Sequence, residues 1–511
     1  MEETKKIEVS SQSTLYLNKE ELDFWKNLND YKWRINNLYY IKDKHGKKIK
    51  FKVNWAQQVI LDDIWFFSLI LKARQLGMTT FFCILYLDQI LFNSNKTASI
   101  IAHTDYDTKK IFERVKFAWE NLPEELKESI GYPRTESVGE MAFPNGSKIF
   151  VARSTRGNTL QFLHVSEFAK ICAKYPDKAE EIISGAINSV EQGNFVSIES
   201  TAEGKEGRFF EFCKEAQNAS LEKRKLSFME FKFFFFPWWK EPSYTTDGDF
   251  SISNEYENYF DGLRKLHDID LTEGQKRWYI TKKKIQGENM FREYPSTPEE
   301  AFMASIEGAY YAEQMKKVYE DQRIRHVPYD SRYNVDTWWD LGMNDENVIL
   351  FTQAVGNEIR FIDLYHNNGE GLGHYVSILR DRGYVYGTHT FPHDVEVRNL
   401  DSEGKSRRET LVELGVRNIR TIERSKDIND DIEGVRKIFS RMYFDERKTV
   451  RLIEALNGYR KEWDDKTGTF KNNPRHDKHS HFADCLRLVA KGWKQHMIGN
   501  STEEVKISNF F

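Results

Sequence analysis

A polar segment between two apolar runs constrains the fold of this chain most. The run 66–71 has the length and composition of a buried strand, and the run 81–87 is typical of a buried helix. The segment 72–80 between them reads Lys-Ala-Arg-Gln-Leu-Gly-Met-Thr-Thr. Where a strand turns into a helix, backbone N–H groups and the helix dipole can bind a phosphate. The sequence therefore predicts either a phosphate-binding loop or an ordinary strand-to-helix turn.

This loop departs from the usual phosphate-loop pattern, in which a glycine and four further residues precede Gly-Lys-Thr. Gly77 and Thr79 are in place. Met78 stands where the lysine is expected, and Lys72 stands where the first glycine is expected. A cation is thus still present at the other end of the loop, and Arg74 adds a second one. The Thr79 hydroxyl is placed to bind Mg²⁺.

We predict that the loop binds ATP with Mg²⁺. Gln57, ahead of the loop, could read the adenine edge, and an amide on a helix surface is the equal alternative. The predicted ATP-binding residues are Gln57, Lys72, Ala73, Arg74, Gln75, Leu76, Gly77, Met78, Thr79 and Thr80.

A second apolar strand, 160–165, ends in Ser166 and Glu167. An ATPase needs a carboxylate that orients the attacking water, and it needs ligands for magnesium. Glu167 could take the first role. Ser166 stands where an aspartate usually orders the magnesium shell, but its hydroxyl brings no charge. The alternative is that Glu167 is a solvated carboxylate at the end of a strand.

Two further segments fit the same site. The strand 195–199 is followed by Ser-Thr-Ala-Glu-Gly at 200–204, where small hydroxyl residues could sense a γ-phosphate. Arg153 and Arg156 precede the strand that ends at Glu167. Either could be an arginine finger, in its own site or in that of a neighbouring subunit. The alternative for each arginine is a surface cation.

Three aspartates in the C-terminal part form a second candidate site. Asp340 lies at the end of a predicted strand, Asp394 ends a later strand, and Asp484 lies one helical turn after His481. Predicted strands at 335–341, 347–354 and 357–365 form a meander beside them. Three such carboxylates can hold two Mg²⁺ or Mn²⁺ ions about 4 Å apart, as an RNase H-like nuclease requires. The alternative is that each aspartate is an ordinary turn residue.

Several residues near these acids have weaker signals. Asp363 could be a fourth acid, although a solvent-facing strand position is favoured. His476, His479 and His481 cluster before the last acid, where a role facing phosphate or supporting a ligand is favoured over a zinc site. Candidate contacts to a DNA backbone are the lysines at 282–284 and the pair Arg407 and Arg408, with a solvated helix surface as the alternative.

The bulk properties limit the remaining possibilities. With 511 residues the chain is too long for one core, and strands alternating with helices from 51 to 205 predict a parallel sheet covered on both faces. The 4 cysteines have no paired spacing, which disfavours zinc sites and disulfides. We expect a soluble cytoplasmic protein, because the sequence has neither a signal-peptide core nor a membrane-spanning stretch. A net charge of −4 gives no support to nucleic-acid binding.

Seven motifs, taken together and in order, resemble the large terminase subunit of tailed bacteriophages, the motor that packages viral DNA. They are KARQLGMTT, LHVSEFAK, STAEG, FPWW, WWDLG, PHD and HFADCLRL. The resemblance implies an α/β chain with an N-terminal P-loop ATPase of the ASCE type, built on a mainly parallel sheet, and a C-terminal RNase H-like nuclease. The expected division is an N-terminal extension (1–50), the ATPase domain (51–305), a linker (306–332), the nuclease domain (333–495) and a C-terminal tail (496–511).

The resemblance also implies roles for particular residues. Some members of the family carry the phosphate-loop lysine at the start of the loop, which matches Lys72. The adenine-side glutamine falls on Gln57, and the arginine ahead of the acidic strand matches Arg156 better than Arg153. The implied coupling residues are Ser200, Thr201 and Ala202. The implied catalytic residues are Glu167, Arg156, Asp340, Asp394 and Asp484, and the implied metal ligands are Thr79, Asp340, Asp394 and Asp484.

The resemblance implies a motor that hydrolyses ATP to move double-stranded DNA into a procapsid and cuts concatemers with two metal ions. Its expected partners are DNA, the portal protein, the small terminase subunit and further copies of itself in a ring, within the host cytoplasm. The departures at Met78 and Ser166 predict weaker Mg–ATP binding by the isolated subunit. Two rival functions remain: a cellular helicase or repair ATPase-nuclease, and a portal-associated scaffold without catalytic activity.

Overall fold

The structure is a computed structural model that describes residues 5–10, 13–17, 19–137, 139–155, 159–287, 289–303, 308–342, 346–397, 405–464, 467 and 469–499. Contacts divide the chain into two compact units, Met1–Ala304 and Ser305–Phe511. Each unit has its own sheet and its own apolar cores.

The sheet of the N-terminal unit has eight strands in the order β12-β5-β11-β10-β6-β9-β8-β7. Neighbours from β12 to β9 are parallel, whereas β8 and β7 form an antiparallel edge. One strand, β11, lies between the phosphate-loop strand β5 and the acidic strand β10, as in an ASCE-type P-loop fold. The strands are β5 (Phe67–Lys72), β6 (Thr97–Ile101), β7 (Thr135–Ser137), β8 (Glu140–Ala142), β9 (Lys148–Ala152), β10 (Leu160–Ser166), β11 (Val190–Ser200) and β12 (Phe231–Phe236).

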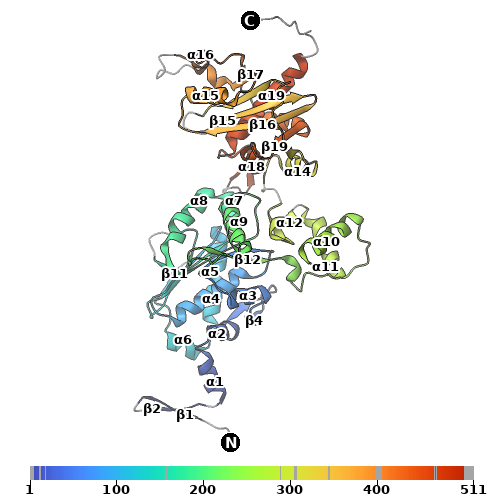
Figure 1. Ribbon diagram of the computed structural model, residues 1–511. Coiled ribbons are helices and arrows are strands. Elements are labelled where there is room, and N and C mark those ends of the chain that lie inside the picture. Colours follow the sequence, from blue (N-terminus) through green and yellow to red (C-terminus); the bar gives the residue numbers. More distant parts are fainter. Residues whose placement is uncertain are drawn as a thin grey trace, which may run out of the picture. The chain divides into compact units, whose positions relative to one another are not determined.

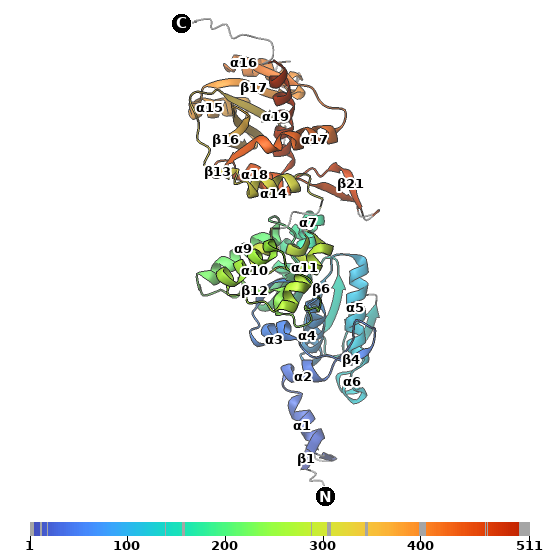
Figure 2. The ribbon, with the colours of Figure 1, turned by 90° about the vertical axis from the view of Figure 1, so that its right-hand side faces the viewer.

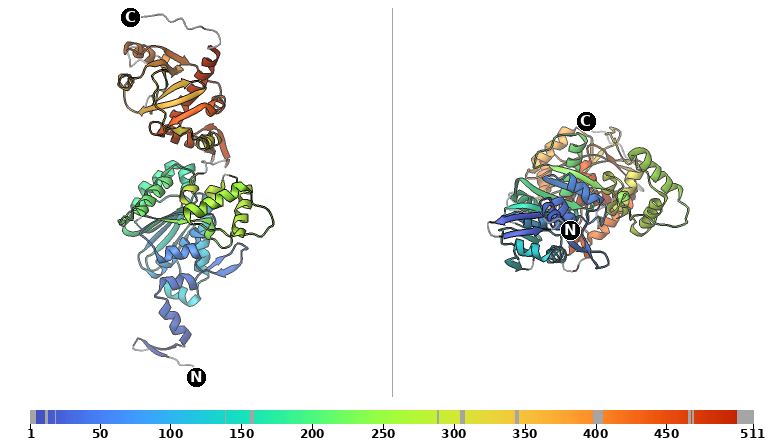
Figure 3. Two further views of the ribbon diagram at one scale, coloured as in Figure 1. Left: turned by 45° about the vertical axis from the view of Figure 1, so that its right-hand side comes forward. Right: turned by 90° about the horizontal axis from the view of Figure 1, so that it is seen from below.

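Helices cover both faces of this sheet (Figure 1). One face packs against α2 (Tyr31–Asn37), α3 (Trp55–Asp62), α4 (Met78–Phe92) and α5 (Asp105–Glu120), and the other against α7 (Phe168–Lys174) and α9 (Arg208–Leu221). Because both faces are covered, the central strands read as continuous apolar runs, and this pattern made them predictable. The other elements are β1 (Lys5–Ser10), β2 (Ser13–Leu17), α1 (Lys19–Asn27), β3 (Tyr40–Lys42), β4 (Lys48–Lys50), α6 (Glu124–Ile130), α8 (Pro176–Glu181), α10 (Asn254–His267), α11 (Glu273–Gln286), α12 (Asn289–Glu293) and α13 (Pro298–Ala301). Figure 3 shows α10 and α11 as a yellow-green pair of helices.

The aromatic run at 233–239 belongs to the edge strand β12 and the 3₁₀ turn Trp238–Lys240. Alternate phenylalanines of β12 join different cores: Phe234 and Phe236 pack on one face of the sheet, and Phe233 and Phe235 pack on the other. The strand ends at Pro237, which has no backbone N–H to donate. The run is thus both strand and core wall.

Part of the predicted N-terminal extension packs into the core of the first unit. Ile35, Leu38 and Tyr39 are buried, and the Arg34 guanidinium makes a two-pronged ion pair with Asp88 of α4, with Nη2–Oδ2 at 2.8 Å and Nε–Oδ1 at 2.9 Å. The Tyr39 hydroxyl donates to the same carboxylate at 2.9 Å. A charge buried in this way is stable only while its partner is present.

We therefore expect Asp88→Ala to lower the free energy of unfolding of the N-terminal unit by about 3–5 kcal/mol, because it leaves the Arg34 charge buried and unpaired. Urea unfolding followed by tryptophan fluorescence measures this loss. The matched control is Asp62→Ala, which breaks the exposed ion pair with Lys32 and should barely move the transition. Equal shifts for the two variants would contradict a structural role for the buried pair.

The sheet of the C-terminal unit has seven strands in the order β13-β19-β16-β15-β14-β17-β18. The strands β14, β15 and β16 form the predicted antiparallel meander, and β17 and β18 continue it in parallel. A three-strand meander extended by parallel strands on the side of its first strand is RNase H-like. The strands are β13 (Ile324–Arg325), β14 (Val335–Asp340), β15 (Asn347–Val355), β16 (Glu358–Asn367), β17 (Tyr386–Pro392), β18 (Ile419–Ile422) and β19 (Met442–Asp445).

The helix α19 (Ser480–Gly499) lies across this sheet and carries the last predicted acid. Gly492 permits the close packing, because a Cβ at that position would lie 2.4 Å from the Trp338 ring. The other helices are α14 (Ala312–Glu320), α15 (Leu372–Arg382), α16 (Arg407–Glu413), α17 (Ile428–Ile438) and α18 (Val450–Gly458), with 3₁₀ turns at His393–Glu396 and Phe439–Arg441. A hairpin of β20 (Lys461–Asp464) and β21 (Thr469–Pro474) projects from the unit in Figure 2.

Much of the predicted linker at 306–332 is part of the second unit. Met315 and Val318 of α14 are buried in its core, and β13 pairs with β19. The polar outer face of α14 hid this packing in the sequence. Within the described parts of the chain, no helix is both long and apolar enough to cross a membrane.

Candidate active sites

The predicted phosphate loop connects β5 to α4. Gly77 adopts a left-handed conformation with φ of 71°, and a Cβ there would lie 2.9 Å from Gln57 Nε2. Glycine is therefore required for both its backbone and its small size. The start of the loop is held from outside, because Ala73 N–H donates to the Phe236 carbonyl and Arg74 N–H donates to the Glu293 carbonyl.

The Gln57 side chain hydrogen-bonds to the phosphate loop. Its Nε2 donates to the Gly77 carbonyl at 3.0 Å, and its Oε1 accepts from the Asn54 N–H at 3.0 Å in a capping box at the start of α3. Both ends of the amide are thus engaged within the protein, and the side chain is only 3% exposed. A contact with adenine stays a prediction, and it would require this amide to exchange partners.

Lys72 lies at the centre of the candidate nucleotide site. Its Nζ is 3.0 Å from Glu199 Oε2 and 3.5 Å from Glu167 Oε1, and its side chain is buried. Burial alone would lower the pKa of Lys72, but the two carboxylates outweigh burial and raise it. The relocated lysine is therefore charged, and it faces the acidic strand end that the sequence paired with the loop.

Glu167 follows β10 directly and has a left-handed backbone, with φ of 55°. Burial opposes its charge, yet Lys72 and Lys170 hold the pKa of this carboxyl down to about 2. Lys170 Nζ lies 3.0 Å from Glu167 Oε2. The carboxylate is ionised at neutral pH and is too weak a base to keep a proton, so it suits the orientation of a water molecule.

Glu199 is a residue of this site that the sequence analysis missed. It lies near the end of β11, is fully buried, and accepts hydrogen bonds at Oε1 from Thr79 Oγ at 2.7 Å and from Ser166 Oγ at 2.9 Å. The signal that could have found it is a glutamate at the end of the mostly apolar run 195–198, next to the predicted coupling residues. Hydroxyl and carboxylate oxygens are the ligands that Mg²⁺ prefers, so these residues fit a magnesium ion.

The predicted coupling residues come directly after Glu199 in the chain. Ser200 Oγ accepts from the Ala169 N–H at 3.2 Å, Ala202 is buried, and the buried Thr201 hydroxyl has no hydrogen-bond partner in the described part of the chain. The next acid, Glu203, pairs with Arg292 of α12 at 2.9 Å. This helix also touches the phosphate loop.

The contact between α12 and the loop is twofold. In addition to the backbone bond of Arg74 N–H, Arg74 Nη1 lies 3.1 Å from Glu293 Oε2. Short as it is, α12 thus joins the phosphate loop to the coupling segment, a link that the sequence did not reveal. The guanidinium of Arg74 faces α12 in this arrangement.

Of the two candidate finger arginines, Arg153 is half-exposed and lies 3.5 Å from Asp105. Arg156 lies outside the described residues, so its role stays a prediction.

In the C-terminal unit, Asp340 and Asp484 are near enough for their charges to interact. Asp340 ends β14, and its Oδ2 lies 2.8 Å from His481 Nδ1 on α19. Burial raises the pKa of Asp484 to about 6, and the charge of Asp340 adds to this rise against the opposing Arg487. Two carboxylates that repel each other in a half-buried site fit a shared divalent cation, which would relieve the repulsion.

The third predicted acid is Asp394. It lies in the 3₁₀ turn after β17, is half-exposed, and contacts His393 Nδ1 at 2.8 Å. Nowhere in the described residues do three or more His, Cys, Asp or Glu side chains stand close enough to hold a metal. The parallel strands β14 and β17 pair side by side, and Asp394 lies in the turn that follows β17. Its role as third ligand stays a prediction.

The weaker candidates have local partners. The Asp363 carboxylate lies 2.9 Å from Arg382 Nε and accepts from Tyr384 OH at 3.0 Å, which makes it a buried structural group and not the solvent-facing one that was favoured. Arg408 pairs with Glu396. The lysines at 282–284 lie over the rings of Trp278, Phe291 and Phe250.

A polar groove of about 460 Å³ opens beside Asp484. Its walls come from the segment before α17, from the end of β21 and from α19. Arg424 and Lys426 are exposed on it, and neither has an ion-pair partner among the described residues. Arg475, Arg487 and His476 also line the groove. The groove therefore offers cations next to the acidic pair.

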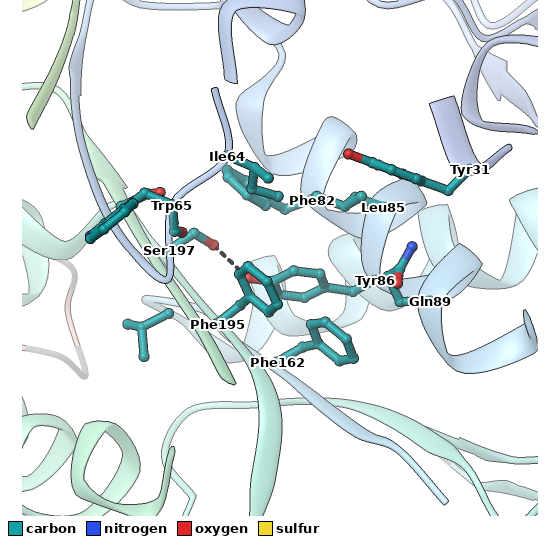
Figure 4. Close-up of a pocket in the computed structure, with 12 residues that line it drawn as sticks. Tyr31, Ile64, Trp65, Phe82, Leu85, Tyr86, Gln89, Phe162, Phe195 and Ser197 are labelled. Carbon is teal, nitrogen blue, oxygen red and sulfur yellow. Dashed lines mark hydrogen bonds between the residues drawn. The ribbon is translucent and has the colours of Figure 1, made fainter. Parts of the chain in front are cut away.

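An apolar cavity of about 210 Å³ lies elsewhere in the N-terminal unit, between α4 and the sheet (Figure 4). Phe82, Phe162 and Phe195 line it, and Tyr86 OH lies 2.9 Å from Ser197 Oγ at its floor. It has none of the charged groups that a triphosphate needs, so the polar cluster around Lys72 is the better nucleotide site.

No family model matches the chain. In structure it is similar to the large terminase of bacteriophage HK97, with 12% identity, a TM-score of 0.43, and coverage of 91% of this chain and 98% of that one. Two further solved structures that it resembles are domains of other large terminases. The large terminase ATPase domain of Thermus phage P74-26 matches 48% of this chain and 93% of its own length, at 17% identity and a TM-score of 0.33. The cobalt-bound large terminase nuclease of thermophilic phage G20c matches 36% and 97%, at 14% identity and a TM-score of 0.26.

Proposed function

We propose that this chain is the large subunit of a viral terminase, an ATP-driven motor that moves double-stranded DNA into a procapsid and cuts it. The observation that carries the proposal is the pairing of two separate polar clusters in one chain. In the first cluster, Lys72 lies near Glu167, and Thr79 donates to Glu199. In the second cluster, Asp340 contacts His481 of α19, and its charge acts on Asp484 of the same helix.

In the ATPase half, Lys72 and the N–H groups at the start of α4 would bind the phosphates, and Thr79 would hold Mg²⁺. The magnesium ion, when bound, neutralises charge that develops on the phosphates. Glu167 would orient the attacking water, and Arg156 of a neighbouring copy would complete the site, which favours a ring. The segment Ser200–Ala202 and the contacts of α12 would carry the effect of hydrolysis away from the loop.

In the nuclease half, Asp340 and Asp484, with Asp394 as the third ligand, would bind Mg²⁺ or Mn²⁺. Such ions activate water and stabilise the leaving oxygen. His481 fixes the direction of the Asp340 carboxylate through its 2.8 Å contact. The expected partners are double-stranded DNA, the portal and the small terminase subunit, in the host cytoplasm.

The test of this function uses the full chain. ATP hydrolysis with and without linear double-stranded DNA, and cleavage of a supercoiled plasmid with Mg²⁺ or Mn²⁺, should both be positive. Unwinding of a tailed duplex would instead favour a helicase or repair enzyme. A chain that shows no heat of binding with Mg²⁺ and ATP, even with DNA and portal present, would be a scaffold.

The groove beside Asp484 gives a further prediction for DNA binding. The double variant Arg424→Ala/Lys426→Ala should weaken DNA binding and lower the slope of log affinity against log salt by about 2, because each phosphate contact contributes about 0.9. Fluorescence anisotropy with Ca²⁺ in place of Mg²⁺ measures this. The control is Arg451→Ala, which removes a cation already paired with Glu454 on α18. An unchanged salt slope would place the DNA elsewhere.

A further inference from the structure

Glu199 is more deeply buried than the predicted catalytic glutamate. Its side chain is 0% exposed, compared with 28% for Glu167. A buried carboxylate is tolerated only when it is paired and hydrogen-bonded. Lys72 supplies the pairing at Oε2, at 3.0 Å. That ion pair involves only Oε2, so it does not account for the contacts of Oε1.

Two hydroxyl groups converge on Oε1 of Glu199. One belongs to Thr79 in the first turn of α4, at 2.7 Å, and the other to Ser166 at the end of β10, at 2.9 Å. The two hydroxyl oxygens lie 3.1 Å apart. The carboxylate is therefore built into the point where the phosphate loop meets the acidic strand end.

The register of the strands explains how Glu199 reaches this point. Ser166 and Glu199 are partners on the adjacent parallel strands β10 and β11. The usual pattern places an aspartate at position 166, and the serine there brings no charge. The hydrogen bond from Ser166 shows that the longer side chain of Glu199 crosses from the neighbouring strand to the same place. The charge absent from one strand is thus present on the next.

We propose that Glu199 supplies the carboxylate that holds the magnesium ion of a bound nucleoside triphosphate, in place of the residue at position 166. This inference rests on the proposed ATPase function and names a residue for it. Thr79 and Glu199 together would present oxygen ligands to the cation or its water shell, Ser166 fixes the direction of Glu199, and Lys72 balances its charge.

The test measures how strongly Mg²⁺ improves nucleotide binding. Affinities for a fluorescent ADP are determined with Mg²⁺ and with EDTA, and their ratio is compared between variants of the full chain. Glu199→Gln keeps the shape of the side chain and removes its charge, so the ratio should fall at least about 10-fold. The double variant Ser166→Asp/Glu199→Gln returns a carboxylate to the strand end and should recover most of the ratio. The matched control, Glu300→Gln, removes a buried carboxylate hydrogen-bonded to Tyr259 and should leave the ratio unchanged.

A second variant covers the case in which Glu199→Gln does not fold. Ser166→Asp alone adds a carboxylate beside Glu199 and should raise the ratio, whereas an unchanged ratio would place the magnesium elsewhere. If Glu199 were only a structural partner of Lys72, Glu199→Gln would weaken binding equally with Mg²⁺ and with EDTA, and the proposal would be wrong. A chain that binds no nucleotide under either condition would instead contradict the ATPase function itself.

Discussion

Glu167→Gln is expected to lower DNA-stimulated ATP hydrolysis by about 10²–10⁴-fold, the range typical for loss of a group that positions or activates water. The amide keeps the size of the side chain but can neither polarise a water molecule nor attract Lys72 and Lys170, which now flank the carboxylate. Nucleotide binding should persist, because Glu199 still holds the Lys72 side chain in place to contact the phosphates. A coupled assay of phosphate release, with and without linear DNA, measures the loss.

The same Glu167→Gln protein should cut plasmid DNA as fast as the unmodified chain, since the nuclease acids lie in the other unit. The control is Glu180→Gln, which removes a surface carboxylate of α8 that is paired with Arg208. It should change neither activity. Hydrolysis above a tenth of the original rate in Glu167→Gln would remove this residue from the reaction.

Asp340→Asn should have the reverse effect. Loss of a carboxylate that binds the metal directly is expected to lower Mg²⁺- or Mn²⁺-dependent cleavage by more than about 100-fold, because mutation of outer partners alone costs 10–100-fold. ATP hydrolysis should remain. The measurement is the rate at which supercoiled plasmid is nicked and linearised at several metal concentrations.

Variants of the other two acids extend this test. Asp484→Asn should match Asp340→Asn, because the two carboxylates interact. Asp394→Asn should match them only if this half-exposed residue moves in to become the third ligand. Asp381→Asn, on an exposed position of α15, is the control. Full cleavage by the Asp340 and Asp484 variants, each still folded, would end the nuclease assignment.

Local sequence patterns predicted most of the two sheets. Strands covered on both faces are mostly apolar, so β5 and β10 stood out as short runs between polar turns. The meander of β14, β15 and β16 was visible because its turns are short. In contrast, α2 and α14 each bury one narrow face, and their polar residues hid the contacts that tie them to the cores.

The residues of the candidate sites also differ in how far the sequence could predict them. The positions of Lys72, Glu167 and Asp340 at or just after the end of a strand were predictable, because apolar runs mark where strands end. Their roles stay predictions. Glu199 was missed because its importance comes from Thr79 and Ser166, which are 120 and 33 residues away in the chain. The link from the phosphate loop through α12 to Glu203 was missed for the same reason.

The sequence by itself determined that a phosphate loop with a relocated lysine precedes an acidic strand end, and that three aspartates follow in an RNase H-like order. Only the tertiary structure decided which side chains meet. The Gln57 amide donates to the phosphate loop, the Glu199 side chain reaches Ser166 on the neighbouring strand, and Asp394 lies in a 3₁₀ turn beside His393. The reason is that apolar periodicity indicates where a strand begins and ends, whereas contacts between strands depend on which strands become neighbours in the sheet, and tertiary packing decides that order.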